Sequence, residues 1–226
     1  MKKLNFDIGE FQAMTKKRAN EIIGGLSDTA KMACQSYGIP AAECKTGAIL
    51  RLVANSTCSD CYALKGNYVR YPAVVKAQYR RFELLLKALA DPEFRALWIA
   101  AIVKLIGIDD KFRWHDSGDV QSIAHIELIC DVARALPDCQ FWLPTREKAL
   151  VARHAAKYTI PGNLVIRLSA AMIDGKAPSH KTTSTVYTND FSIVGMACKA
   201  PSQNGECRDC RACWNSDVSN VSYKKH

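Results

Sequence analysis

The sequence predicts an α/β protein whose parallel sheet forms a partial, open barrel, followed by a Cys-rich segment that binds a metal. Three observations lead to this prediction. Short apolar runs alternate with helical patterns through the middle of the chain, and polar residues follow several of these runs. After residue 196 the periodicity ends and cysteines become frequent. We expect a partial-barrel domain over residues 1–196 and a metal-binding extension over residues 197–226 that packs on it.

Two helices are expected before the main strands. Residues 74–90 have a helical pattern that ends at Asp91, because the residue before a proline disfavours helical geometry. Asp91 is placed to cap a second helix, which begins with Pro92 and ends near Gly107.

Four runs of β-branched and aromatic residues predict the parallel strands. They cover residues 111–115, 139–144, 163–169 and 184–188. Helical patterns at 120–136 and 147–158 separate the first three runs, as right-handed parallel crossovers require. Residues 48–53 (AILRLV) are expected to form an earlier strand, although so short an apolar run does not distinguish a strand from a helical turn.

Ten cysteines in this chain call for an explanation other than disulfides. With 226 residues, of which 48% are hydrophobic, the protein can bury a core without covalent staples. The N-terminus lacks the apolar stretch of a signal peptide after Lys2 and Lys3, and no window approaches 18 apolar residues. We therefore expect a soluble protein of a reducing cytoplasm whose thiols serve metal or redox chemistry.

The positive charge is concentrated in the first part of the chain. Of a formal net charge of +9, residues 1–87 contribute 14 Lys and Arg against 7 Asp and Glu, whereas residues 88–196 are balanced. Such a surface attracts nucleic acid or a phosphorylated substrate, or offsets the charge of a thiolate-bound cluster. A solvated basic face without a partner is the alternative.

Four cysteines near the C-terminus have the spacing of a metal site. Cys198, Cys207, Cys210 and Cys213 form a C-x8-C-x2-C-x2-C pattern. Thiols at successive C-x2-C spacings reach different irons of one 4Fe–4S cluster, and a more distant cysteine completes it. Zinc is the alternative, but a structural zinc site ordinarily uses two separate pairs, whereas Cys210 belongs to both pairs here.

A second group of cysteines lies earlier in the chain. Cys58 and Cys61 form a C-x2-C pair, and Cys44 supplies a possible third thiolate, with Cys34 as a less favoured substitute. One C-x2-C pair alone also fits a redox dithiol. If the pair follows the first strand, it lies where α/β folds place their sites. The candidate cofactor-binding residues beside these metal ligands are Tyr62, Lys65 and Asp119.

Polar residues close three of the predicted strands. His115 and Asp116 follow the first, Arg146 follows the second, and Ser169 ends the third. Because the carboxyl ends of parallel strands share one face, these residues are expected to form a catalytic site. His115 would act as an acid/base fixed by Asp116, and Arg146 as an anion-binding fork. Taken singly, residues such as Thr145 also fit helix capping.

These motifs together resemble a known family. Cys44, CSDCYALKGNY, FRWHDSGDV, FWLPTR and GECRDCRACW, spread from about Cys34 to the C-terminus, are similar to the phage gene product 88 family. That resemblance implies a protein of bacteriophages or bacterial genomes, placed in the host cytoplasm if phage-encoded.

A more distant likeness is to radical S-adenosylmethionine enzymes. They share a Cys loop ending in C-x2-C-Tyr, a parallel partial barrel and, in some members, an auxiliary cluster after the barrel. Their C-x3-C-x2-C motif would place its first cysteine at position 54, where this chain has Ala54. The likeness therefore leaves S-adenosylmethionine binding open.

Two functional hypotheses follow. The first is a radical-SAM-like enzyme with a reactive cluster at Cys44, Cys58 and Cys61 and an auxiliary 4Fe–4S cluster at the C-terminus. The second is a non-enzymatic protein, stabilised by its metal, that binds nucleic acid or transfers electrons. No membrane partner is expected, and the sequence does not fix the oligomeric state.

Overall fold

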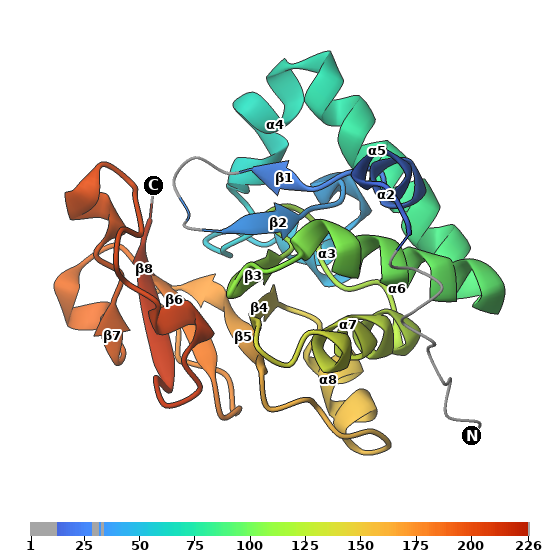
Figure 1. The fold of residues 1–226 in the computed structure, drawn as a ribbon. Coiled ribbons are helices and arrows are strands. Elements are labelled where there is room, and N and C mark those ends of the chain that lie inside the picture. Colours follow the sequence, from blue (N-terminus) through green and yellow to red (C-terminus); the bar gives the residue numbers. More distant parts are fainter. Residues whose placement is uncertain (1–12, 29–31, 33, 226) are drawn as a thin grey trace.

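The computed structural model describes residues 13–28, 32 and 34–225. Within them, eight strands form one open sheet in the order β1-β2-β3-β4-β5-β6-β8-β7 (Figure 1). Only β1 runs antiparallel to its neighbour. The strands are β1 Ser27–Asp28, β2 Gln35–Tyr37, β3 Lys111–Trp114, β4 Gln140–Thr145, β5 Leu164–Ile173, β6 Thr183–Tyr187, β7 Met196–Ala197 and β8 Asn220–Lys224.

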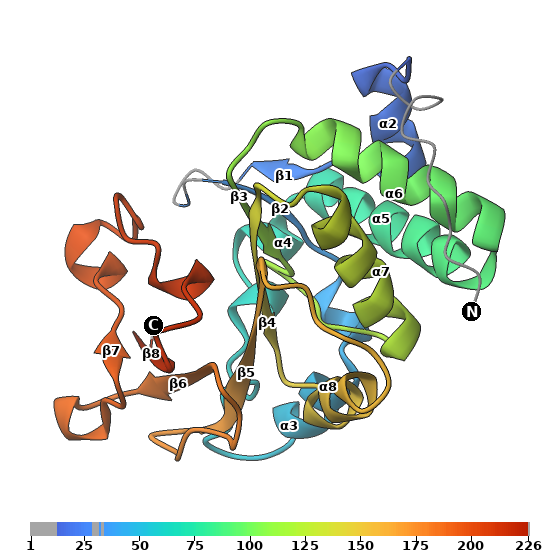
Figure 2. The same cartoon turned by 60° about the horizontal axis from the view of Figure 1, so that its bottom comes forward.

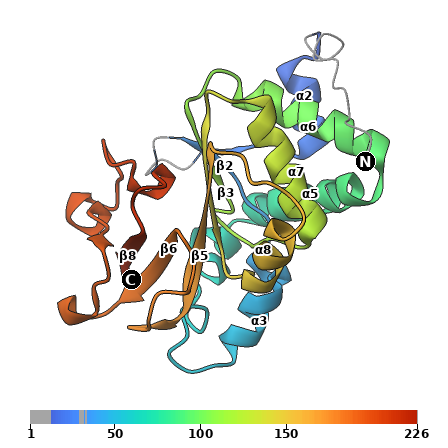
Figure 3. The same ribbon diagram turned by 90° about the horizontal axis from the view of Figure 1, so that it is seen from below.

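The helices are α2 Lys16–Ile23, α3 Lys45–Arg51, α4 Asn67–Arg70, α5 Pro72–Ala90, α6 Pro92–Ile106, α7 Ile123–Ala135 and α8 Lys148–Ala155. Figure 3 shows α5 to α8 on one side of the central strands and the C-terminal segment on the other. Among the residues that the structure describes, none of the helices has the length and apolar content needed to cross a membrane.

The main core lies between the central strands and the helices. Alternate residues of β3 and β4, such as Phe112, Trp114 and Phe141, are fully buried there against Trp98 and Ile102 of α6. Alternation directs the intervening residues to the opposite face. That face carries Arg113 of β3, which is in register with Trp142 of β4.

The α/β class and the open, mostly parallel sheet are confirmed, and the barrel curvature stays a prediction. The two helices before the main strands are α5 and α6, and the carboxylate of Asp91 caps α6 by accepting from the N–H groups of Glu93 and Phe94. Pro92 lies in the first turn, and Gly107 ends the helix with a positive φ. The four predicted strands are β3 to β6, with α7 and α8 between the first three.

The predicted strand at residues 48–53 is wrong, because residues 45–51 form α3. Its apolar side chains do not enter the sheet: Ile49 is 70% and Leu52 is 89% exposed. The helix is fixed by a distant residue, since the carboxylate of Glu147 accepts from the N–H and the hydroxyl of Thr46 at 2.8 and 2.9 Å. The first parallel strand is instead β2. The segment with Cys58 and Cys61, residues 52–66, is called the Cys loop below and comes after β2 and α3.

The C-terminal segment becomes part of the sheet. The boundary expected at residue 197 falls at the end of β7, and β8 inserts in parallel between β6 and β7. Figure 2 shows this segment, in orange to red, beside the sheet and away from the helices. Hydroxyl groups of the paired strands contact each other, as Thr185 and Ser222 do at 2.8 Å.

Arg167 of β5 anchors the Cys-rich segment. Its side chain is fully buried, and all five of its N–H donors have a backbone carbonyl acceptor. Nε donates to Cys213, Nη1 to Thr183 and Val218, and Nη2 to Ala212 and Asn215, at 2.7 to 3.3 Å. One planar guanidinium thus holds the turn that contains Cys213 against the sheet.

We predict that Arg167→Lys lowers the free energy of unfolding by about 2–4 kcal/mol, because an ammonium group leaves buried carbonyls of this turn without donors. Urea unfolding of the two proteins, prepared with the same metal content, measures the loss. Arg18→Lys, on an exposed ion pair of α2, is the matched control and should change stability by less than about 0.5 kcal/mol. Equal stability of wild type and Arg167→Lys would contradict the anchoring role.

Candidate functional site

A cavity of 390 Å³ opens at the carboxyl ends of the parallel strands. The ends of β3, β4, β5, β6 and β8 contribute to it, together with the Cys loop after β2. It collects most of the residues that the sequence singles out: Cys44, Cys58, Cys61, Tyr62, His115, Asp116, Asp119, Arg146 and Ser169. Lys65 is not among the lining residues and forms an exposed ion pair with Asp60.

Cys44 and Cys58 face the same point in space. A Cβ placed on Gly47 would lie 3.6 Å from the sulfur of Cys44 and 3.7 Å from that of Cys58, and 2.9 Å from the Cys44 Cβ. A side chain at this position would therefore crowd both thiols. Burial, followed by the charge of Asp119 and of the other two cysteines, raises the pKa of the Cys44 thiol to about 12. A metal that binds here displaces a proton from it.

The Cys loop is tied to β5. The N–H of Thr57 donates to the carbonyl of Ala171 at 2.8 Å, and Ser56 forms an antiparallel bridge with Met172. The hydroxyl of Ser56 caps the turn by accepting from the N–H of Ser59. These bonds hold Cys58 and its neighbours over the end of the sheet without using the thiols.

His115 has a strained backbone and an unpaired side chain. Its φ is +52°, a region that few residues other than Gly, Asn and Asp adopt, and its N–H donates to the carbonyl of Tyr37. The imidazole is buried, and its ring centroid lies 5.1 Å from that of His125; within the described part of the chain neither of its nitrogens has a hydrogen-bond partner. Burial, and then the charge of Arg113, lowers its pKa to about 3. The ring is thus neutral at physiological pH, and so low a pKa suits a neutral ligand better than the acid/base that the sequence suggests.

Asp116 organises the neighbouring loops rather than the ring of His115. Its carboxylate accepts from the hydroxyls of Ser36 and Tyr68 at 3.0 and 3.2 Å. Its backbone carbonyl accepts from the hydroxyl of Tyr62 at 2.6 Å. These bonds join β2, the Cys loop and the end of β3.

The end of β4 connects the other parts of the site. The carboxylate of Asp119 accepts from the hydroxyl of Thr145 at 2.6 Å and from the N–H of Arg146 at 2.9 Å. Burial raises the pKa of Asp119 to about 6, although these hydrogen bonds oppose the shift. The Nε of Arg146 donates to the sulfur of Cys58 at 2.9 Å, so its cation faces a predicted metal ligand. Ser169 accepts from the hydroxyl of Ser184 at 3.1 Å.

The four C-terminal cysteines affect one another electrostatically. Burial, and then the charges of Cys198 and Cys210, raise the pKa of Cys207. Burial likewise raises the pKa of Cys213 to about 12, with Cys198 among the smaller causes. The N–H of Cys210 closes a turn on the carbonyl of Cys207 at 2.9 Å. All four are free thiols of intermediate exposure. No three of these described sulfur atoms lie within 4.8 Å of one another, so it is the chemistry of the donor set, and not a closed geometry, that suits a thiolate-bound metal.

Tyr223 links the cavity to one of the C-terminal cysteines. The hydroxyl of Tyr223 lies 3.1 Å from the sulfur of Cys213, and Tyr223 also lines the cavity. The positive charge of Arg113 lowers the pKa of Cys207, Cys213 and Tyr62, against the larger effect of burial. Cys34, the substitute ligand, is also close to Cys207, although burial is the main reason that its pKa rises to about 12.

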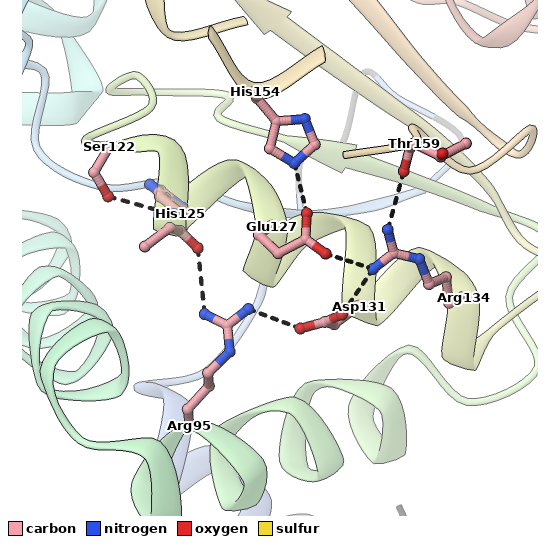
Figure 4. A network of polar contacts seen from close by, with 9 residues as sticks. Arg95, Ser122, His125, Glu127, Asp131, Arg134, His154 and Thr159 are labelled. Atoms are coloured by element: carbon pink, nitrogen blue, oxygen red, sulfur yellow. Dashed lines mark hydrogen bonds and ion pairs between the residues drawn. The ribbon is translucent and has the colours of Figure 1, made fainter. Parts of the chain in front are cut away.

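Sequence reasoning missed a third group, which lies between α7 and α8. In the part of the chain that the structure describes, Glu127, Cys130 and His154 are the one set whose ligand atoms all lie within 4.8 Å of each other. Spacing gave no signal, because His154 comes from another helix. Figure 4 shows that His154 contacts Glu127, at 2.6 Å, and that Arg134 pairs with Glu127 and Asp131.

This third group is best explained as an ion-pair network. Arg95 completes it by pairing with Asp131 at 2.7 Å, so both carboxylates have cationic partners. Cys130 is fully buried in the apolar core, as its position in a helical pattern predicts. A metal there would compete with the hydrogen bond of His154 and the ion pair of Arg134 at the Glu127 carboxylate.

Comparisons with known proteins identify the family alone. A family model described as Gene product 88 matches residues 10–216. No curated protein and no solved structure matches the chain.

We predict that His115 makes stability depend on pH. In the unfolded chain the pKa of His115 is about 6.5, whereas in the folded protein it is about 3. Between these two values the unfolded state binds more protons than the folded state, so stability falls as pH falls. His115→Asn, which tolerates the positive φ, should reduce that slope by up to about 1.4 kcal/mol per pH unit. Chemical unfolding at several pH values measures it.

The opposite contribution of Asp119 cancels in this comparison. Its raised pKa lets the folded chain bind extra protons between about pH 4 and 6, in wild type and variant alike. Identical slopes for the two proteins would show that His115 is not buried in its neutral form.

Proposed function

Because the chain belongs to the Gene product 88 family, whose name states no activity, we propose a function from the chain's own residues. The protein is an iron–sulfur enzyme in which Cys198, Cys207, Cys210 and Cys213 hold a 4Fe–4S cluster. Cys44, Cys58 and Cys61 hold a second centre beside the cavity. One observation carries the proposal: Cys44, Cys58 and Cys61 line one cavity, and Tyr223, which lines the same cavity, contacts the sulfur of Cys213 in the C-terminal group.

The C-terminal centre is supported by its spacing and its surroundings. Cys207, Cys210 and Cys213 follow one another at intervals of three residues, as in ferredoxin-type runs. Arg167 orders the backbone around Cys213 without using the sulfur. The hydroxyl of Tyr223 is placed to donate to that sulfur, the kind of hydrogen bond that tunes a cluster's reduction potential. Zinc is the alternative metal.

The second centre is supported by the position of the Cys loop. Three thiols leave one metal position for an exchangeable ligand, and the cavity beside them has room for a small molecule. When bound, such a cluster supplies electrons one at a time. Arg146 faces the Cys58 sulfur and offsets thiolate charge, and Asp119 fixes the backbone N–H of Arg146.

The proposal keeps two features of the likeness to radical S-adenosylmethionine enzymes, the partial barrel and the reactive cluster. An open parallel sheet with a Cys loop after its first parallel strand, β2, supports it. Ala54 at the place of the first motif cysteine weighs against nucleoside binding. We propose the partial-barrel architecture and the reactive cluster, and leave S-adenosylmethionine as a ligand to be tested by its effect on the cluster's spectrum.

Electron transfer without a substrate is the second candidate, because the four C-terminal cysteines are partly exposed and a redox partner could approach a cluster that they hold. It gives no role to the polar strand ends that line the cavity. Binding of nucleic acid by the basic N-terminal third remains a further proposal, and it requires an affinity that falls steeply with salt.

The test is iron and acid-labile sulfide content of protein purified without oxygen. We expect about eight irons per chain if both centres are cubanes. Replacing Cys207, Cys210 and Cys213 by Ala should remove about half of the iron, and so should replacing Cys44, Cys58 and Cys61. Cys130→Ala, a buried thiol outside both groups, is the control and should keep all of it.

Other outcomes separate the alternatives. If the C-terminal variant alone loses all its iron, there is one C-terminal cluster and the function narrows to binding or electron transfer. If both triple variants lose all their iron, the two groups share one centre. Zinc without sulfide in anaerobic wild-type protein would reject the iron–sulfur proposal and leave a structural metal site.

A further inference from the structure

Arg113 is a cation without a carboxylate partner inside the candidate site. It projects from β3 on the face opposite the helices and lines the cavity. In the described ranges, no carboxylate oxygen lies within salt-bridge distance of its guanidinium. The charge of Asp116 reaches it, but that carboxylate is engaged by Ser36 and Tyr68. Burial lowers the pKa of this half-buried arginine, but the neighbouring phenols and Asp116 raise it by more, so the surroundings favour a cation there.

Most of the donors of Arg113 are poorly used. A guanidinium has five N–H groups. One nitrogen, Nη1, contacts the thioether sulfur of Met32 at 3.1 Å, a weak acceptor, and Nη2 lies 3.4 Å from the hydroxyl of Tyr62. Among the residues that the structure describes, the buried Nε has no hydrogen-bond partner. The fork is therefore available for an acceptor that these residues do not provide.

The guanidinium is held in place by an aromatic ring. It lies 4.5 Å from the ring centroid of Trp142, its register partner on β4, and that ring packs edge-on against Trp214 of the Cys-rich segment. Stacking of this kind orients the planar fork without consuming its N–H donors. A fork fixed in this way is prepared for two parallel hydrogen bonds to one oxyanion.

The other arginine of the cavity is already occupied. The sequence suggests Arg146 as the anion-binding fork, yet its Nε donates to the Cys58 sulfur and its Nη1 reaches the carbonyl of Ala170 at 3.5 Å. Arg146 thus faces the metal ligand, whereas Arg113 faces the remaining space. Lys224 and Lys225 from the end of β8 add positive charge to the same cavity.

We propose that Arg113 is the anion-binding residue of the cavity and that the ligand there is a small molecule with a carboxylate or phosphate group. This inference rests on the proposed function, because it names the chemical class of the ligand that would meet the second metal centre. The oxyanion accepts from the Arg113 fork, and Tyr62, whose hydroxyl donates to the carbonyl of Asp116, lines the same cavity.

The experiment titrates anaerobically purified, full-length protein with inorganic phosphate and, separately, with succinate, with ionic strength held constant by chloride. Thermal unfolding and tryptophan fluorescence report binding, since Trp142 lies under the guanidinium. Arg113→Gln removes the fork, Arg113→Lys keeps the charge alone, and Arg18→Gln on exposed α2 is the control. Iron and sulfide are measured in every sample.

We expect one of the two anions to raise the unfolding midpoint of wild type and of Arg18→Gln. Arg113→Gln should lower the affinity for that anion at least about tenfold while the protein keeps its metal. The affinity of Arg113→Lys should lie between those of wild type and Arg113→Gln. The anion that binds more tightly shows whether the natural ligand carries phosphate or carboxylate. Arg113→Lys keeps the test valid if Arg113→Gln does not fold.

Two results would overturn the inference. One is a metal-loaded wild type that responds to neither anion, in which case Arg113 only offsets the charge of the cysteine groups. The other is unchanged affinity in both Arg113 variants, which would assign binding to the surface lysines. Absence of iron from wild type would instead reject the proposed function and is read from the same samples independently of the anion response.

Discussion

The hydrogen bonds of Arg167 are the constraint on which the rest of the site depends. A segment with few aliphatic residues has no core of its own, and the sheet has to order it. Arg167 does so by giving all five N–H donors to backbone carbonyls of the segment and of β6. The strand β8 can then insert beside β6, which brings Tyr223 to the cavity and Cys213 to Tyr223. Without that anchor, the position of the C-terminal cysteines relative to the cavity and its cysteines would not be fixed.

Local signals in the sequence were enough for much of the fold. The Asp91-Pro92 step marks the end of one helix and the cap of the next. The carboxylate of Asp91 accepts from the N–H groups of Glu93 and Phe94, so both capping hydrogen bonds are local in sequence. Strand β8 gave no such signal, because its residues pair through polar side chains such as Ser222 rather than through an apolar run. The helix at residues 45–51 was missed for a related reason: its capping carboxylate, Glu147, lies 101 residues away from Thr46.

The composition of the site was easier to predict than its contacts. Parallel strands place their carboxyl ends together, so His115, Asp119 and Arg146 were expected on one cavity, which they line. Which side chains bond to which depends on loop conformations that a pattern does not encode. Asp116 therefore binds Ser36 and Tyr68. Arg113 was not predicted as a site residue, because it lies inside a predicted strand and the sequence does not show what covers that face of the sheet.

We propose two metal centres, one beside the cavity and one in the C-terminal group next to Tyr223. Anomalous diffraction at the iron absorption edge, from crystals grown without oxygen, tests this claim most directly because it locates each metal in space. The account predicts two iron peaks, one beside Cys44, Cys58 and Cys61 and one within the C-terminal group. A single peak, or peaks at the zinc edge alone, would contradict it.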